Sequence, residues 1–269
     1  MKQLKFLMVA FTLLMGVSFT SCLNDDAGES MYDGIGYVRT VMGSYFVDLY
    51  GNTYHPTMAS VTEMEAQGFK MSGTDLAQIV FKYVEDTPAT KAEGGTFTPQ
   101  DYRIKLVSAI AVDSYSTRYA SSVEDMEAIP ETAPIVTLEP TDNYGQTYKP
   151  WMYGAEMLVL PISWKMENKE EMLKHTMELV YINDESNESS TELVFYLRHN
   201  KGTDTKTDVF AVRNKAYDVK QIMSDFKGKH GSYPTTIRIK AKTDMDGAKL
   251  PEKYTDYTIE NFKWNPSNQ

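Results

Sequence analysis

The sequence predicts an all-β protein in which a small barrel or curled sheet is followed by an antiparallel β-sandwich. Short apolar runs with alternating polar residues recur between turn residues along most of the chain. The composition favours strands, because the 269 residues include 18 tyrosines, and Thr and Val recur in the apolar runs. A stretch rich in proline and acids, residues 114–147, separates two groups of runs and predicts a linker region between two domains.

The first 21 residues predict a signal peptide. Lys2 and Lys5 precede an apolar segment, Phe6 to Val17, that is too short to cross a bilayer as a helix. Small residues then lead to Cys22, the single cysteine of the chain, and this arrangement resembles the lipobox of bacterial lipoproteins. Cys22 would then be the first residue of the mature protein and would bind the lipid bilayer through its acyl chains. The alternatives are a secreted protein cleaved elsewhere and an N-terminal membrane helix.

Residues 22–31 predict a polar tether between the lipid and the first domain. Asp25 and Asp26 form an acidic cluster beside Cys22, which resembles the surface-export signal of lipoproteins in the Bacteroides group. The alternative is a solvated acidic tether with no signal function. The expected location is the cell envelope, where a lipid anchors the protein in the outer membrane. The sequence does not decide between the cell surface and the periplasmic face.

The charge of the mature chain argues against some partners. Removal of residues 1–21 takes away two of the 27 basic residues and none of the 37 acids, which leaves a formal charge of −12. A surface this negative repels nucleic acid and anionic lipid heads. Since no cysteine remains beyond the lipid site, a disulfide is excluded and stability must come from packing.

The first predicted domain spans residues 32–113. Gly43-Ser44 lies between two apolar runs and has the Gly-first form of a type II′ hairpin turn, which Gly51-Asn52 repeats. Residues 61–67 predict one helical turn that ends at Gly68. The predicted strands are residues 35–41, 45–50, 53–54, 77–83 and 102–112. Four or five strands in about 80 residues suit a small barrel or curled sheet.

The second predicted domain spans residues 148–266. Asp218 suits the N-cap of a short helix over 218–226, which is followed by Gly228. The predicted strands are residues 157–164, 176–182, 193–197, 208–212, 237–241 and 257–262, with a further short strand at 135–138 in the linker region. Six or seven strands with turns at short spacing predict an antiparallel sandwich.

The exported part of the chain resembles the NigD-like lipoproteins of Bacteroides and Prevotella. The matching features are Cys22, the segment Tyr32 to Val38, and the segment Leu193 to Asn200, in which Leu-Arg-His-Asn is the most family-like tetrapeptide. The resemblance implies an N-terminal OB-type barrel and a C-terminal β-sandwich. It also implies an immunity-like role, but no biochemical activity.

No catalytic, metal or cofactor motif is evident in the sequence. The four histidines include no pair at the spacing of a zinc site, and no phosphate or dinucleotide fingerprint occurs. The segment Asp244-Met245-Asp246-Gly247 starts like a calcium loop, but Thr255 stands where the closing Glu should be, so we interpret it as a turn. We therefore predict no catalytic residue, no metal site and no cofactor.

One candidate binding loop remains, formed by Arg198, His199 and Asn200 before a polar loop. The alternative is that these side chains satisfy backbone groups at a strand end. We predict a non-enzymatic envelope lipoprotein that acts as a binding or immunity-like module with an unknown protein or glycan partner. The alternatives are a glycan-binding or glycan-cleaving sandwich, with carboxylates beside Trp151 or Trp164, and a structural role in an envelope assembly. A nucleic-acid partner is excluded because the basic groove of nucleic-acid-binding barrels is missing.

Overall fold

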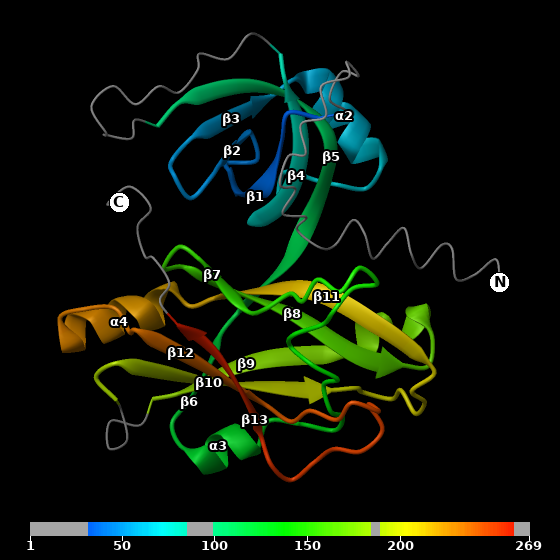
Figure 1. Ribbon diagram of the computed structural model, residues 1–269, viewed down its shortest axis with the longest axis vertical. Coiled ribbons are helices and arrows are strands. Elements are labelled where there is room, and N and C mark those ends of the chain that lie inside the picture. Colours follow the sequence, from blue (N-terminus) through cyan, green and yellow to red (C-terminus); the bar gives the residue numbers. More distant parts are fainter. Residues whose placement is uncertain (1–31, 85–98, 184–188, 261–269) are drawn as a thin grey trace. The chain divides into compact units, whose positions relative to one another are not determined.

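The computed structural model describes residues 32–84, 99–183 and 189–260. These residues form two compact units, which we describe separately. The barrel unit contains the described residues up to Ser114, and the sandwich unit contains those from Tyr115 onward. Both units consist mainly of strands (Figure 1), so the predicted all-β class is confirmed.

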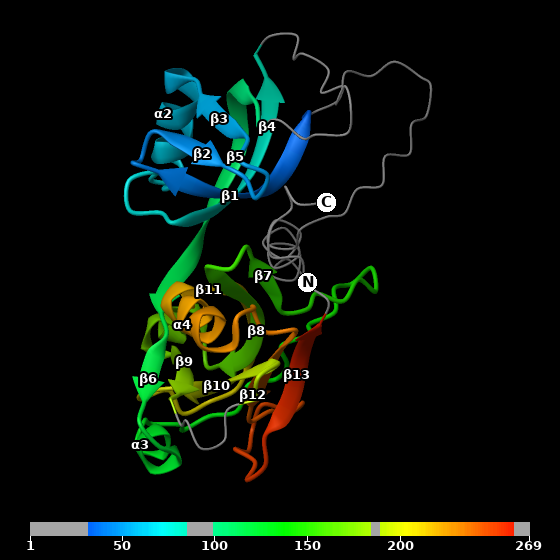
Figure 2. The same ribbon diagram turned by 90° about the vertical axis from the view of Figure 1, so that its left-hand side faces the viewer.

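Five strands close the barrel unit, and a single helix, α2 (Met58–Ala66), joins the third strand to the fourth (Figure 2). The strands are β1 (Gly34–Val41), β2 (Tyr45–Val47), β3 (Thr53–Pro56), β4 (Leu76–Tyr83) and β5 (Asp101–Ser116). They follow one another in the order β3-β2-β1-β4-β5, and a parallel pairing of β3 with β5 closes the ring. This closed five-stranded barrel agrees with the OB-type domain that the resemblance implies.

The turn between β1 and β2 differs from the predicted type II′ turn at Gly43-Ser44. The Ser44 backbone N–H donates to the Val41 carbonyl at 3.0 Å, so the two central residues are Met42 and Gly43. Both have positive φ, +51° and +63°, as a type I′ turn requires. Val41 pairs with Tyr45, so Ser44 is an extra residue between the turn and the paired part of β2, and this register points Phe46 into the core.

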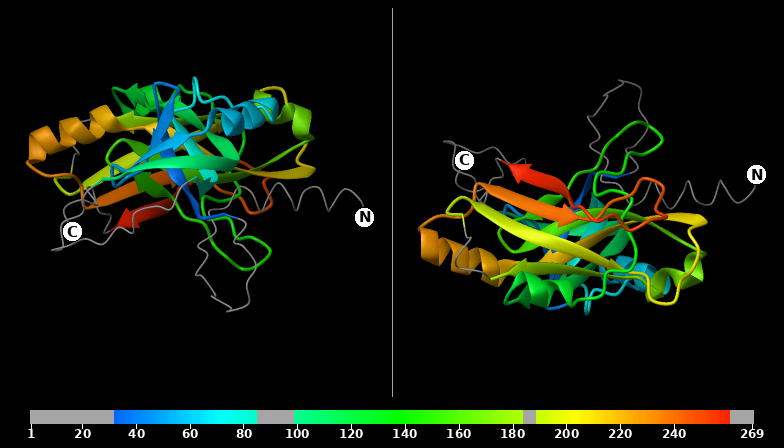
Figure 3. Two further views of the ribbon diagram at one scale, coloured as in Figure 1. Left: turned by 90° about the horizontal axis from the view of Figure 1, so that it is seen from above. Right: turned by 90° about the horizontal axis from the view of Figure 1, so that it is seen from below.

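Two sheets face each other in the sandwich unit. One contains β7 (Trp151–Tyr153), β8 (Met157–Met166) and β11 (Val209–Asp218). The other has the order β13-β12-β10-β9-β6 (Figure 3). Its strands are β6 (Arg118–Ala120), β9 (Thr176–Ile182), β10 (Glu192–Asn200), β12 (Thr236–Ala241) and β13 (Thr255–Glu260).

The second sheet is not purely antiparallel, which corrects one part of the predicted sandwich. β10 pairs with β12 in parallel, and β6 pairs with β9 in parallel. Parallel neighbours need a crossover connection, and between β10 and β12 the chain passes through β11 and the helix α4 (Lys220–His230). The N-cap of α4 is Val219, one residue after the predicted Asp218, and the helix continues to His230, with Gly231 as its C-cap, rather than ending before Gly228.

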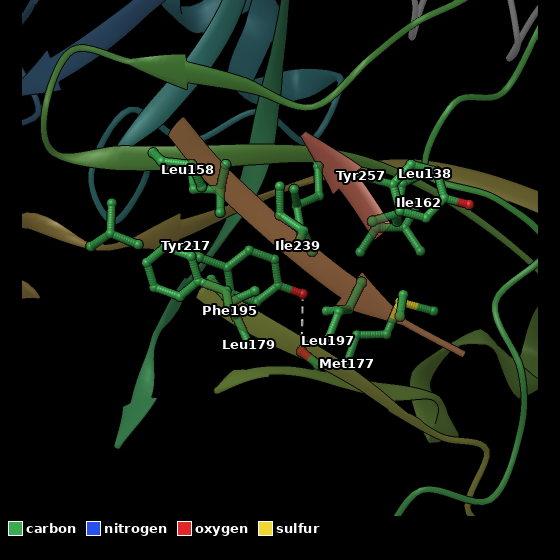
Figure 4. Close-up of a cluster of buried hydrophobic side chains, with 14 of the residues drawn as sticks. Leu138, Leu158, Ile162, Met177, Leu179, Phe195, Leu197, Tyr217, Ile239 and Tyr257 are labelled. Atoms are coloured by element: carbon green, nitrogen blue, oxygen red, sulfur yellow. Dashed lines mark hydrogen bonds between the residues drawn. The ribbon is translucent and has the colours of Figure 1, made fainter. Parts of the chain in front are cut away.

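The core of the sandwich unit fills the space between its two sheets (Figure 4). Side chains alternate along each strand, so Leu158 and Ile162 of β8 meet Phe195 of β10 and Ile239 of β12. The Tyr217 hydroxyl donates to the Met177 carbonyl at 3.1 Å, which satisfies a phenol inside this apolar cluster.

Residues 115–147, most of the predicted linker region, lie within the sandwich unit. They form β6 and the short helix α3 (Val123–Glu127) before an irregular stretch. Ile135 and Leu138 of that stretch are fully buried in the sandwich core, and Ile135 forms a bridge to Thr243. Among the described residues, no helix is both long and apolar enough to cross a membrane.

Candidate functional site

The outward-facing side chains of β1, β2, β3 and β5 form a surface that we call the barrel face. Strand register places them in two rows. One row contains Val41, Tyr45, His55 and Arg103, and the other contains Arg39, Val47, Thr53 and Asp101. The residues between them along the strands, such as Phe46, Tyr54 and Tyr102, are buried in the barrel. The period-two alternation of the strands therefore builds the face and the core together.

The barrel face carries an aromatic contact beside cationic groups. The rings of Tyr45 and His55 lie 5.4 Å apart, and His55 Nε2 is 3.9 Å from the Asp101 carboxylate. The side chains of His55 and Asp101 are 49% and 80% exposed, so this group is accessible to a partner. Tyr and Arg are the residues that protein interfaces favour over the rest of the surface.

A cluster of positive charge continues from the face along β5. Arg103 and Lys105 are both exposed, and Lys105 lies directly opposite Lys82 of β4. Like charges opposite each other on paired strands are destabilising. Arg103, Lys105 and Lys82 thus gather three positive charges on two neighbouring strands of a chain whose formal net charge is −10, and such a cluster favours contact with acidic groups.

Asp48 orders the loop that joins β2 to β3. Its carboxylate accepts the backbone N–H groups of Tyr50 and Asn52, at 2.8 and 2.9 Å, and the Tyr54 hydroxyl at 2.9 Å. Burial and then the charge of Asp48 raise the pKa of Tyr54, so this phenol stays protonated and keeps donating. The loop thus fixes the two strands that present Tyr45 and His55.

Three sequence-predicted residues, Cys22, Asp25 and Asp26, lie outside the described residues. The predicted binding loop lies at the end of β10, and there Arg198 and His199 are buried. Arg198 Nε donates to the Ile129 carbonyl at 3.0 Å, and Asn200 Oδ1 accepts from the Thr132 hydroxyl at 2.8 Å. These side chains fasten the irregular stretch after α3 to the sheet.

His199 is also part of a buried polar cluster that sequence analysis did not find. His199 Nε2 lies 2.8 Å from His175 Nδ1, and His175 Nε2 lies 2.8 Å from Asp204 Oδ2. His199 Nδ1 lies 2.9 Å from the Pro134 carbonyl oxygen. All three residues of the cluster are less than 7% exposed. We call this set the His–His–Asp cluster.

The electrostatics of the cluster follow from its burial and its hydrogen bonds. Desolvation lowers the pKa of His199 to about 4, so its imidazole is neutral at physiological pH. Burial alone would raise the pKa of Asp204, but the hydrogen bonds from His175 and from the backbone N–H groups of Glu167 and Lys206 outweigh it and lower that pKa. The carboxylate is therefore ionised inside the protein.

The cluster was missed because its members meet only through strand pairing. His199 is opposite Met177, two residues from His175, once β9 and β10 pair. The sequence predicted both strands but not their register. A search along the chain for metal-ligand spacing cannot find such a group. The register of the β9–β10 hairpin would have been the signal.

Two further expectations can be placed in the structure. Trp164 is 1% exposed and belongs to the sandwich core, so it cannot serve as a sugar-stacking platform. Asp244 accepts the backbone N–H groups of Asp246, Ala248 and Lys249, as expected of a turn. Within the described ranges, no group of three or more His, Cys, Asp or Glu side chains could hold a metal ion.

Comparison with solved structures shows the same fold in proteins from Bacteroides species. A protein described as a lipoprotein of Bacteroides fragilis matches with a TM-score of 0.63 and 22% identity, covering 84% of this chain and 96% of that one. A protein of unknown function from Bacteroides vulgatus matches with a TM-score of 0.53 and 10% identity, over 85% and 90% of the two chains. A NigD-like immunity protein from Bacteroides caccae matches with a TM-score of 0.45 and 12% identity, over 83% and 90%.

No protein-family model matches the sequence. No curated protein matches it either. The solved structures thus define the class of protein by fold alone: a barrel followed by a sandwich, as in lipoproteins of the Bacteroides group.

Proposed function

We propose that this protein is a non-enzymatic lipoprotein of the outer membrane that binds a macromolecular partner through the barrel face. The observation that carries the proposal is the row formed by the partly exposed Tyr45 and the exposed His55 and Arg103, held on paired strands of a closed barrel. An aromatic ring and a cation at fixed spacing can bind an apolar group and an acidic group of one partner.

The proposed location in the outer membrane is based on the first 26 residues. Cys22 directly follows an apolar segment of signal-peptide length, and Asp25 and Asp26 follow the cysteine. The described lipoprotein from Bacteroides fragilis has the same fold, which is consistent with a place in the cell envelope. The proposed anchor is the acylated Cys22, and the proposed export signal is the acidic pair.

The charge of the barrel face favours a partner that carries acidic groups. Arg103, Lys105 and Lys82 lie on adjacent strands, and each is at least partly exposed. The partner that we favour is a protein, in line with the immunity-like role that the NigD-like resemblance implies. Glycan binding, the alternative, is an outcome of the binding test below.

The proposed location and lipid anchor are tested by protease treatment of intact cells, with cell fractionation as a second measurement. Cys22→Ala should move the protein from the membrane fraction to the soluble fraction. If the protein faces outward, the wild type is digested on whole cells, and the variant with Ala at Asp25 and Asp26 is protected. Membrane retention of Cys22→Ala would refute the lipid anchor.

Binding is tested by chemical cross-linking on cells followed by mass spectrometry. Arg103→Glu should abolish the cross-linked partner, because it reverses the charge at the centre of the cationic cluster. The matched control is Lys70→Glu, which makes the same charge change at an exposed position away from the face. A glycan adduct would select the alternative, and equal capture by both variants would contradict a binding role for the barrel face.

A further inference from the structure

The hydrogen bonds of the His–His–Asp cluster fix how many protons it holds. The Pro134 carbonyl can only accept, so His199 Nδ1 must carry a proton. One proton must lie between His199 Nε2 and His175 Nδ1, and one must lie between His175 Nε2 and Asp204 Oδ2. The chain of contacts therefore contains three protons, whereas two neutral imidazoles and a carboxylate supply only two.

The third proton makes the buried cluster electrically neutral. A carboxylate that faces two neutral rings would leave one buried negative charge, which is costly without a partner. With the extra proton, an imidazolium balances the charge of Asp204. The proton rests on His175, since desolvation keeps His199 neutral and Asp204 accepts two backbone N–H groups in addition to the ring.

The cluster joins three separate segments at one end of the sandwich. His175 ends the loop of residues 167–175, and Asp204 belongs to the loop of residues 201–208. Asp204 Oδ2 also accepts the Glu167 backbone N–H at 3.0 Å, so it binds both ends of the first loop. His199 holds the third segment through Pro134, and its own carbonyl accepts the N–H of Thr132 at 3.0 Å.

We propose that the third proton is a latch, which fixes the loops 167–175 and 201–208 to the sheet while it is bound and releases them when it is lost at higher pH. Without that proton, one of the two contacts of 2.8 Å, His175 to His199 or His175 to Asp204, joins two lone pairs. The negative charge of Asp204 is then also unbalanced, so that contact opens. The device makes the conformation of this end of the sandwich depend on pH.

The charged groups around the cluster act on the proton in opposite directions. Lys215 of β11 and Lys201 of the second loop lie close enough to disfavour a positive charge on His199. Asp204 favours the positive charge on His175 at direct contact. Lys174 of the first loop and Lys206 of the second loop both interact electrostatically with Asp204. The direct carboxylate contact is the strongest of these interactions because both side chains are excluded from solvent.

The proton count can be measured directly in the unmodified mature chain, residues 22–269. Nitrogen-15 chemical shifts and one-bond N–H couplings of the histidine side chains report which ring nitrogens carry protons. We expect protons on three of the four ring nitrogens of His175 and His199 at neutral pH. Protons on only two of the four would overturn the proposal.

The release of the loops can be followed with a spin label in a Cys22→Ser background. Leu173→Cys places the label in the latched loop at a side chain that is 93% exposed, so the label does not disturb packing. Tyr144→Cys is the matched control, because its side chain is 84% exposed in a turn that Asp142 closes by itself. We expect a several-fold rise in the mobile fraction at 173 when the pH is raised from neutral to alkaline, with no such rise at 144.

Asp204→Asn removes the charge that balances the imidazolium. We expect the transition at position 173 to move to lower pH in this variant, because the third proton is then held less tightly. An unchanged transition in Asp204→Asn, or equal mobility changes at 173 and 144 in the parent chain, would contradict the latch. If Asp204→Asn does not fold, the proton count in the unmodified chain still decides the question.

Discussion

The barrel and the sandwich differ in whether their charged side chains are exposed or buried. The buried polar side chains of the barrel unit, Asn52, Ser60 and Gln78, are all uncharged. The sandwich unit buries ionisable groups, including Arg198, Asp204 and Lys215, in hydrogen-bonded or ion-paired arrangements. Conversely, the barrel presents its charged groups in rows on an exposed strand surface.

This difference in the burial of charged side chains suits the two units to different roles. Buried charges are specific in geometry, and in the sandwich they fasten irregular segments and loops to the sheet. Charged groups on the barrel face, such as Arg103 and Asp101, are exposed, so a partner can reach them. This difference supports both of our proposals, binding through the barrel face and conformational control in the sandwich. The predictions below test this comparison.

The largest expected effect comes from apolar packing, which the two units share. Phe195→Ala in the sandwich and Phe46→Ala in the barrel each remove a fully buried ring. Each should lower the free energy of unfolding by about 3–5 kcal/mol, because the lost contacts leave a cavity. Denaturant titrations measure the change. A loss below about 1 kcal/mol at either site would show that the unit depends little on its apolar core.

Removal of a buried charge should cost nearly as much in the sandwich. Arg198 Nη1 lies 3.4 Å from Glu131, whose side chain is 3% exposed and whose other cationic partner is Lys242, at 3.2 Å. Arg198→Ala should therefore destabilise the protein by about 3 kcal/mol. Arg238→Ala, which removes a partly exposed pair with Glu192, is the control and should cost less than about 1 kcal/mol. Equal losses would remove the distinction between buried and surface charges.

The stability of the sandwich should fall in mild acid because of His199. The pKa of His199 is about 4 in the folded protein and 6.5 in the absence of burial. Below about pH 6.5 the unfolded chain therefore binds a proton at this residue that the folded chain does not bind. The stabilisation is complete above about pH 6.5 and is lost as the pH falls towards about 4, by about 3 kcal/mol in total. Unfolding titrations at several pH values measure this loss.

His199→Asn should remove this part of the pH dependence, because it removes the group that titrates. His55→Gln, at an exposed histidine of the barrel, is the control and should retain the loss. If the wild type and His199→Asn show the same slope between about pH 4 and about pH 6.5, burial of His199 is not the cause.

The smallest predicted change in stability concerns the turn between β1 and β2. Met42 adopts φ +51°, a conformation that costs a non-glycine residue energy, and its side chain is 92% exposed. Met42→Asn places Asn-Gly in a type I′ turn and should stabilise the protein by about 0.5–1 kcal/mol. Thermal unfolding measures the gain. Met58→Asn, at an exposed methionine of α2, is the control and should give none.

The fold class could be predicted because it depends on local patterns. The alternation of apolar residues along 102–112 and 193–197 predicted strands that the structure contains as parts of β5 and β10. Turn type, helix starts and parallel pairings could not be predicted, because they depend on register. In the structure Val41 pairs with Tyr45, which leaves Met42, Gly43 and Ser44 between the strands instead of the two residues that the sequence predicted.

The candidate sites were less accessible to sequence reasoning. The sequence predicted a strand over 45–50, but only the pairing of β2 with β3 shows that Tyr45 is outside and Phe46 inside. Arg198 and His199 were singled out as a family-like motif, yet their partners Ile129 and Pro134 lie more than 60 positions away. Contacts of such long range leave no local pattern.

The most direct test of the account is photo-cross-linking on intact cells from two positions of the barrel unit. A photoreactive phenylalanine derivative replaces either His55, on the barrel face, or Lys70, which is exposed outside it. The account predicts a discrete adduct from position 55 and none from position 70. The absence of an adduct from position 55, or the same adduct from both positions, would contradict the assignment of binding to the barrel face.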